Sequence, residues 1–339
     1  MPTAVISFER AIREAKSLYT KQHLLLGNGF SIACRPDIFT YDALFDRASF
    51  PDESAPARRA FDILETRDFE EVMRALKSAS KLVRALRPDH GALADELQNA
   101  VTALREILVG TIARQHPDKP SDIPEEAYGC CRAFLAHFDH IYTLNYDLLL
   151  YWALMQKELP PPISFDDGFR TPDTGPDAYV TWEVEKSDQQ NVYCMHGALH
   201  IFDAGAELQK YTWVNTGIRL IDQIRDALSR DLYPLIVAEG ESRHKKARIM
   251  HSNYLSRGYR SLPKCGGALF VFGHSMASND EHILHLIEHG QVKHLYVSVF
   301  GNPGTVKNQA IISRAGLLPR VRKKLQVSFY DAASAHVWS

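Results

Sequence analysis

Short apolar runs alternate along the chain with segments in which apolar residues recur at three- and four-residue steps. The short runs are apolar at most positions, which is typical of parallel strands covered on both faces. They span residues 23–27, 140–144, 191–196, 267–272, 294–300 and 325–330. The segments between them are typical of amphipathic helices. This alternation predicts an α/β fold, a doubly wound (Rossmann-like) parallel sheet of about six strands.

A long helical insertion separates the first two predicted strands. Residues 50–138 carry apolar residues at helical spacing and are expected to form a helical subdomain. Residues 160–176 are rich in Asp, Gly and Pro and are expected to form a loop. Residues 205–262 form a second, mixed insertion. We therefore expect residues 1–339 to form a single domain with two insertions.

The composition excludes several classes of protein. The net charge of −2 gives no basic field for nucleic acid, and no apolar run approaches the length of a membrane span. The first residues show an amphipathic pattern without the long apolar core of a signal peptide. The five cysteines include no Cys-x-x-Cys pair, which favours a reduced, cytoplasmic protein and disfavours a cysteine zinc site.

Small and polar residues follow four of the predicted strands. They are Gly27, Asn28, Gly29, Phe30 and Ser31, then Asn145 and Asp147, then His196, then Gly273 and Ser275, with Asp280 at the start of the next helix. Because open α/β sheets bind ligands outside the carboxyl ends of their strands, we expect these residues to share one site. Glycines allow close backbone approach, and a helix that begins near Ser31 would favour a phosphate.

Each of these motifs also has a plain structural explanation. Asn and Asp are common at strand ends and helix caps, and two glycines around one residue fit a tight turn. A histidine at a strand end is more often a hydrogen-bonding residue than a catalyst. Similarly, residues 68–71 and the basic group Lys245, Lys246 and Arg248 could face a ligand, but solvated helix surfaces are expected there.

Two groups of histidines are candidate metal ligands. His282, His285 and His289 share one face of a predicted helix, and His196 and His200 are four residues apart. Neither group has the His-Glu-x-x-His spacing or an accompanying acid cluster. Since the chain has 15 histidines, chance grouping is expected. We expect no metal.

In their order along the chain, the strand-end motifs resemble those of the sirtuin-like family of NAD-consuming domains. That family shows a Gly-x-Gly-x-Ser turn, a Thr-x-Asn-x-Asp strand end, a His-Gly pair and a late Gly-x-Ser, which correspond here to residues 27–31, 143–147, 196–197 and 273–275. The resemblance covers about residues 24–330. Residues 237–255 also resemble a bacterial branch catalogued as a domain of unknown function. Sirtuin deacetylases carry a four-cysteine zinc module that this chain cannot supply, so the resemblance is to a zinc-less branch.

The resemblance implies an NAD hydrolase that releases nicotinamide and ADP-ribose, with NAD as its substrate. Asn145 would bind the ribose and orient the water, His196 would act as general base, and Asp147 would hold the nicotinamide side or stabilise charge. The turn of residues 27–31 would hold the pyrophosphate, while Gly273, Ser275 and Asp280 would lie on the adenosine side. Neither Asn145 nor His196 is expected to lie in the core.

Several alternatives remain open from the sequence. Some relatives in the wider sirtuin-like group act in anti-phage defence by depleting NAD, so a homo-oligomer or a partner defence protein is a further expectation. A non-catalytic nucleotide-binding sensor could use the same pocket, as could a protein deacylase or an ADP-ribosyltransferase. The sequence does not decide between NAD and NADP or between hydrolysis and cyclisation. It also assigns no role to Glu239, Lys245 or Lys246.

Overall fold

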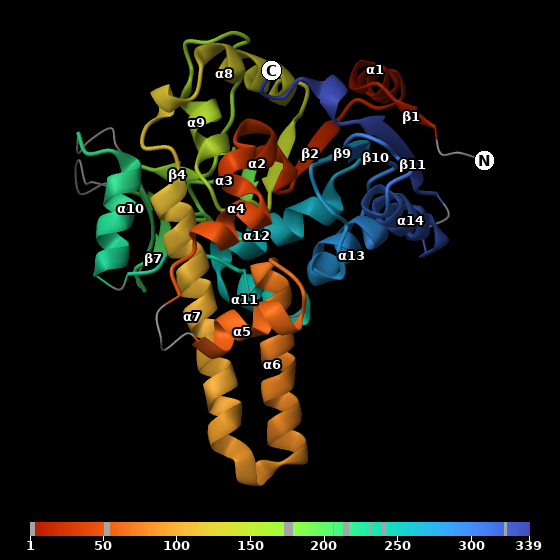
Figure 1. Ribbon diagram of the computed structural model, residues 1–339. Helices are drawn as coiled ribbons and strands as arrows, with labels where there is room; N and C mark the ends of the chain where they lie inside the picture. Colours follow the sequence, from red (N-terminus) through yellow and green to blue (C-terminus); the bar gives the residue numbers. More distant parts are fainter. Residues whose placement is uncertain are drawn as a thin grey trace.

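The centre of the computed structural model is a parallel sheet of seven strands (Figure 1). In spatial order they are β1 (Val5–Ile6), β11 (Gln326–Asp331), β10 (His294–Val299), β9 (Ala268–Phe272), β2 (Gln22–Leu26), β3 (His140–Thr143) and β6 (Val192–Cys194). Every neighbouring pair is parallel. The structure describes residues 4–50, 55–172, 179–205, 207–212, 217–230, 232–238, 242–321 and 324–339.

The predicted parallel sheet is confirmed, with one strand more than expected. The six predicted strands correspond to β2, β3, β6, β9, β10 and β11, all in one sheet. The additional strand, β1, has two residues and pairs with Phe329 and Tyr330 of β11. A strand of two residues is too short to produce a recognisable pattern in the sequence.

Alternate residues of the central strands supply two separate apolar cores. Leu24 and Leu26 face one core, whereas Leu25 faces the other, as the two-residue period of a strand requires. The first core includes residues of α1 (Phe8–Leu18), α8 (Glu125–Leu135) and α9 (Leu149–Met155). The second includes residues of α12 (Asn253–Ser261), α13 (Glu281–His289) and α14 (Val306–Val321). Helices therefore cover both faces, which explains why the strands are apolar at successive positions.

A second sheet, which the sequence analysis did not predict, is antiparallel. Its strands, in spatial order, are β4 (Phe169–Arg170), β5 (Tyr179–Trp182), β8 (Leu208–Tyr211) and β7 (Ile201–Asp203). β4 lies within the segment expected to be a loop, and its pairing with β5 is the reason that the segment is not irregular throughout. Phe169 and Trp182 pack on Tyr254 of α12, with ring centroids 5.2 and 5.7 Å apart. These contacts join the second sheet to one layer of helices.

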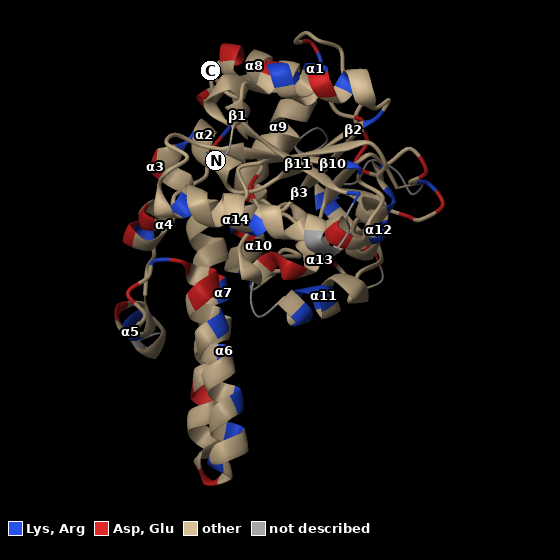
Figure 2. Ribbon diagram, turned by 90° about the vertical axis from the view of Figure 1, so that its right-hand side faces the viewer, with Lys and Arg blue, Asp and Glu red and all other residues tan. Residues whose placement is uncertain are grey.

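The helical insertion separates into two parts. α6 (Phe69–Leu86) and α7 (Gly91–Gln115) form a long hairpin that projects from the body in both views (Figures 1 and 2). Acidic and basic residues are distributed along it (Figure 2). They are joined by η2 (Pro88–His90), and α5 (Ala55–Ile63) packs beside them. α8 instead packs on the main sheet.

Of the helices in the described ranges, none has the combination of length and apolar character that a membrane span requires.

The remaining helices are short or belong to the mixed insertion. α2 (Gly29–Cys34), α3 (Pro36–Phe39) and α4 (Tyr41–Arg47) follow β2 directly, and η3 (Pro120–Asp122) precedes α8. The mixed insertion contributes α10 (Leu220–Ser229), α11 (Ser242–His251) and η4 (Leu262–Lys264) in addition to β8 and α12. Two short helices, η5 (Ser278–Asp280) and η6 (Ala333–Ala335), follow β9 and β11.

Candidate active site

A cavity of about 660 Å³ lies at the carboxyl edge of the main sheet, where β2, β3 and β9 end. The strand order reverses at β2, because β3 lies on one side of it and β9 on the other. Open α/β sheets bind ligands at such a reversal. The cavity is lined by nine of the predicted site residues: Gly27, Asn28, Gly29, Asn145, Asp147, His196, Gly273, Ser275 and Asp280. The other two, Phe30 and Ser31, lie behind its wall and are fully buried.

The turns after β2 and β9 pack against each other, backbone to backbone. Gly27 N donates to Phe272 O at 2.9 Å, and Gly29 N donates to Gly273 O at 2.8 Å. A Cβ atom on Gly29 would lie 2.5 Å from Gly273 Cα, and one on Gly273, where φ is +70°, would lie 2.6 Å from Gly29 Cα. No side chain fits in either place. The glycines are therefore required for the contact between the two turns, whatever ligand they meet.

In the first turn, the backbone N–H groups of Gly27, Gly29, Phe30 and Ser31 already donate to protein carbonyl groups. α2 begins at Gly29, two residues before the predicted start, and is six residues long. Phe30 N donates to Gly27 O and Ser31 N to Asn28 O, both at 3.0 Å. The Phe30 ring packs on Trp338, with centroids 5.0 Å apart. A phosphate at this turn would therefore meet donors that are largely engaged with carbonyl groups.

A chain of hydrogen bonds fixes the amide of Asn145. Asn145 Nδ2 donates to Ser31 Oγ at 2.9 Å, and Ser31 Oγ donates to Asp147 Oδ2 at 2.5 Å. Asp147 Oδ1 accepts from Leu149 N at 2.9 Å. Burial raises the pKa of Asp147, and the hydrogen bonds from Ser31 and Leu149 N oppose that rise in part. Asp147 therefore positions Asn145 through Ser31, which the sequence pattern did not indicate.

His196 is buried and faces two other titratable side chains. Its Nε2 lies 3.0 Å from His282 Nε2 and 3.9 Å from Asp280 Oδ1. Burial holds the pKa of His196 well below its ordinary value, despite the opposing effect of the Asp280 carboxylate, so its imidazole is neutral at neutral pH. His196 is 1% exposed and Asn145 is 8% exposed. The expectation that both lie outside the interior is therefore wrong: they are buried polar residues on the wall of the cavity.

A buried group of ions forms another part of the wall. Lys245 Nζ donates to Glu70 Oε2 at 2.6 Å and to Asp280 Oδ1 at 3.1 Å. Asp280 Oδ2 is 3.0 Å from His274 Nε2. Burial alone would lower the pKa of Lys245, but the carboxylates of Glu70 and Asp280 raise it. Burial alone would raise the pKa of Asp280, but Lys245 and the hydrogen bond with His274 hold it well below its ordinary value. Lys245 and Asp280 are therefore both charged.

Glu70 connects this ion group to η5 and to the segment that follows β3. Its Oε1 accepts from Tyr146 OH at 2.9 Å, and its Oε2 also accepts from Asn279 Nδ2 at 2.8 Å. From the sequence, Glu70 and Lys245 are both expected to lie on solvated helix surfaces. Lys245 instead lies on the buried side of α11 together with Ile249, four residues later, and that spacing was the signal that could have identified it.

Two basic neighbours of Lys245 on α11 are not part of the ion group. Lys246 and Arg248 are exposed, as expected for a solvated helix surface. Glu239 lies outside the described residues.

Asp68 adds a further carboxyl group to the cavity. It caps α6, where its Oδ1 accepts from Glu70 N at 2.9 Å and from Glu71 N at 3.3 Å. Burial, and then the neighbouring charge of Glu70, raise its pKa to about 6. Asp68, Glu70, Asp147 and Asp280 all line the cavity. The wall is therefore rich in acidic groups.

In the structure, the members of each candidate histidine group lie apart from one another. His282 is buried beside His196, whereas His285 and His289 are exposed on the outer side of α13. His200 does not line the cavity and packs on Tyr151, with ring centroids 4.8 Å apart. The ligand atoms of His196, Asp280 and His282 do lie within 4.8 Å of one another. However, the Lys245 ammonium already supplies a cation beside Asp280, which disfavours a metal ion there.

No curated protein matches this chain. Residues 24–338 match a family described as a domain of unknown function, DUF4917. The match extends from within β2 to beyond η6, so it includes every predicted site residue and the whole main sheet except β1 and the first two residues of β2. The chain therefore belongs to the DUF4917 family of domains of unknown function.

Proposed function

We propose that this protein is an NAD hydrolase, a zinc-less relative of the sirtuin-like domains, which cleaves the bond between nicotinamide and ribose. The observation that carries the proposal is the convergence of Asn145, His196 and the turn of residues 27–29 on one cavity. These groups belong to the motifs that resemble the sirtuin-like family. The cavity volume of about 660 Å³ is in the range of small-molecule and cofactor sites.

The composition of the cavity wall suits the chemistry of this bond. Departure of nicotinamide leaves positive charge on the ribose, so a site must stabilise a cation and deliver a water molecule. Four carboxyl groups line the cavity, and fixed negative charge in a water-poor site stabilises a developing cation. Apolar side chains, including Phe39, Leu44, Phe69 and Leu144, also line it and offer surfaces for the nicotinamide and adenine rings.

Asn145 and His196 are the residues to which we assign the reaction. The bond from Nδ2 to Ser31 holds the Asn145 amide in one orientation, and its Oδ1 would accept a hydrogen bond from a ribose hydroxyl or from the attacking water. The neutral imidazole of His196 would take a proton from that hydroxyl or water. Asp280, 3.9 Å from His196 Nε2, would stabilise the protonated ring. Asp147 would act through Ser31 as a positioning residue.

The pyrophosphate and adenosine would lie along the turns after β2 and β9. Gly27, Gly29 and Gly273 keep side chains out of this part of the cavity. Ser275, Thr305 and Lys307 also line it and are exposed, so they can offer hydroxyl and ammonium groups to phosphate. By the same resemblance, the reaction would deplete cytoplasmic NAD in bacterial anti-phage defence, with a homo-oligomer or a partner protein controlling it.

A nucleotide-binding sensor is the second candidate function, and one observation favours it. His196 Nε2 is already engaged with His282, and the ring is almost completely buried. A histidine held in this way can shape a pocket without transferring a proton. Nucleotide binding without turnover would then be the function of the same cavity.

Incubation of the purified protein with NAD tests the proposal. We expect the protein to release nicotinamide and ADP-ribose without an acceptor. Chromatography detects both products. Binding by calorimetry without any product would contradict hydrolysis and favour the sensor. Turnover that requires an acylated or acceptor protein would instead favour a deacylase or an ADP-ribosyltransferase. Repeating the assay with NADP shows which dinucleotide is the substrate. Detection of cyclic ADP-ribose would distinguish cyclisation from hydrolysis.

A further inference from the structure

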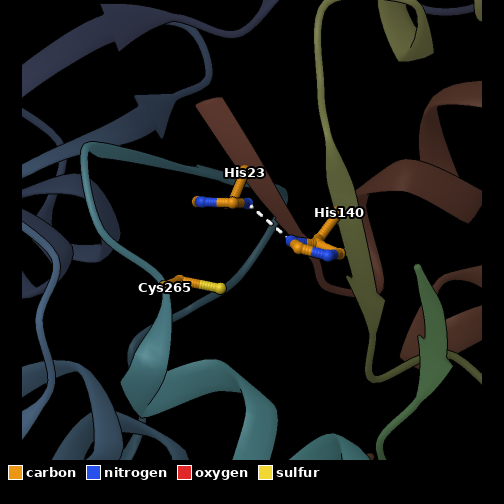
Figure 3. Close-up of side chains that lie close together, drawn as sticks. All are labelled: His23, His140 and Cys265. Atoms are coloured by element: carbon orange, nitrogen blue, oxygen red, sulfur yellow. Dashed lines mark hydrogen bonds between the residues drawn. The ribbon is translucent and has the colours of Figure 1, made fainter. Parts of the chain in front are cut away.

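Three side chains of types that commonly bind metals meet at the amino edge of the main sheet, opposite the cavity (Figure 3). His23 of β2 pairs in register with His140 of β3, so their side chains lie on the same face of the sheet. Cys265 precedes β9, whose Ala268 pairs with Gln22 of β2. A ring nitrogen of each histidine and the sulfur of Cys265 come together because the three strands are neighbours and begin at the same edge.

The spacing of the donor atoms is close to that of a tetrahedral site. His23 Nδ1 and His140 Nδ1 are 3.1 Å apart, and the donor atoms of all three residues lie within 4.8 Å of one another. With zinc–nitrogen bonds of about 2.0–2.1 Å and zinc–sulfur bonds of about 2.3 Å, tetrahedral geometry places nitrogens about 3.3 Å apart and nitrogen about 3.6 Å from sulfur. The nitrogens thus already have a ligand-like separation, and the sulfur would need to approach them by at most about 1.2 Å.

The surroundings of the three residues also suit a bound cation. Tyr142 OH lies 3.0 Å from Cys265 Sγ and 2.8 Å from Ser261 Oγ, so it can donate to a thiolate while it accepts from Ser261. The carboxylate of Asp139, which precedes His140 in the chain, adds negative charge near both rings.

A simple hydrogen bond between the two imidazoles is the competing explanation of the short contact. An N–H···N bond accounts for 3.1 Å between the nitrogens, but it requires no cysteine. Cys265 is buried and its sulfur points toward the two rings in Figure 3. The arrangement also differs from the group formed by His285, Glu288 and His289, which lies on the outer side of the single helix α13 and has no thiol.

We propose that His23, His140 and Cys265 bind a zinc-class metal ion. The ion would coordinate the two Nδ1 atoms and the deprotonated sulfur, with water completing a four-coordinate shell. The thiol proton passes to solvent when the metal binds. The bound ion would link β2, β3 and the segment before β9, the same strands that end at the cavity. This site is independent of the proposed reaction with NAD.

Cobalt(II) titration of the chelator-treated, phosphine-reduced protein tests this site, because a cobalt–thiolate bond gives a near-ultraviolet charge-transfer band. We expect a band that saturates at one ion per chain and disappears when zinc is added. Cys265→Ala should abolish the band, and His140→Ala should weaken cobalt binding by at least about tenfold. Cys194→Ala, which removes a thiol outside this group, should leave the band unchanged.

Zinc should also raise the melting temperature of the wild-type protein but not that of Cys265→Ala, since only a folded three-residue site binds it. Circular dichroism verifies that the variants are folded. The absence of a thiolate band in wild-type protein, or a band of the same strength in Cys265→Ala, would overturn the proposal and leave the pair of histidines as a hydrogen bond.

Discussion

At the scale of single residues, Asp68 gives the clearest dependence of stability on pH. Its pKa is raised to about 6 by burial and by the charge of Glu70, so the folded protein binds this proton more tightly than the unfolded chain does. The resulting stabilisation is fully present below about pH 4 and is lost as the pH rises through about 6. Above that range, the folded protein carries an ionised Asp68 in a poorly solvated place.

Asp68→Asn should therefore stabilise the protein at pH 7 and have little effect near pH 4. Asparagine keeps the oxygen that caps α6, so the substitution removes the titration but retains the cap. The expected gain in the free energy of unfolding at pH 7 is about 1–3 kcal/mol, measured by urea denaturation at both pH values. Asp188→Asn, at an exposed position, is the control. An equal change in stability at pH 4 and pH 7 would show that Asp68 does not titrate in this range.

Residues at strand ends could be predicted from the sequence, whereas their buried partners could not. Asn145, Asp147 and His196 each follow a recognisable apolar run, so their edge of the sheet was predictable. Glu70 and Lys245 are 175 residues apart and meet only because α6 and α11 fold over the same cavity. A charged residue on a helix is usually solvated, and periodicity carries no information about a partner so distant in sequence.

At the scale of elements, the two glycine turns behave as one unit. Gly29→Ala should lower the free energy of unfolding by about 1–3 kcal/mol, because its Cβ would meet the backbone of Gly273, which cannot rotate away. It should also weaken NAD binding, since separating the turns changes the cavity. Urea denaturation and calorimetry measure the two effects.

Gly129→Ala is the matched control for the glycine substitution. Gly129 lies within α8 and has no atom within 4 Å of the position where a Cβ would be, so alanine should stabilise the helix by about 0.5–1 kcal/mol. If Gly29→Ala were as stable as wild type and bound NAD equally well, the close contact between the turns would have no energetic role.

The parallel strands were predictable because burial on both faces makes them continuously apolar. The antiparallel sheet was harder to recognise: its four strands have two to four residues each, and their pairing partners are set by tertiary contacts. Tyr179–Trp182 did carry a signal, since Tyr, Val, Thr and Trp all favour strands. The expected helix near Ser31 was placed two residues late, because its start depends on the glycine turn and not on apolar spacing.

At the scale of the whole molecule, Lys245 joins segments from three parts of the chain. It connects α6 of the projecting hairpin, α11 of the mixed insertion and η5 beside the main sheet. Lys245→Met would leave the carboxyl groups of Glu70 and Asp280 facing each other in a buried place. We expect a loss of about 3–5 kcal/mol in the free energy of unfolding, measured by urea denaturation.

Two further variants separate this effect from a general loss of charge. Lys246→Met, at an exposed position on the same helix, should change stability by less than about 0.5 kcal/mol. Adding Glu70→Gln to Lys245→Met should recover part of the loss, because one of the two uncompensated carboxylates is removed. Equal stability of the Lys245 and Lys246 variants would contradict the role of Lys245 as the cation that holds the three segments together.

We propose above that the cavity at the carboxyl edge cleaves NAD with His196 as the base. The most direct measurement is the rate of nicotinamide release by wild type, His196→Ala and His200→Ala, together with the NAD affinity of each. His200 is the matched control, since it is also a buried histidine but does not line the cavity. We expect His196→Ala to be slower by about 10²–10⁴-fold with NAD affinity within a few fold of wild type, and His200→Ala to retain its activity. A folded His196→Ala protein that releases nicotinamide as fast as wild type would contradict the account.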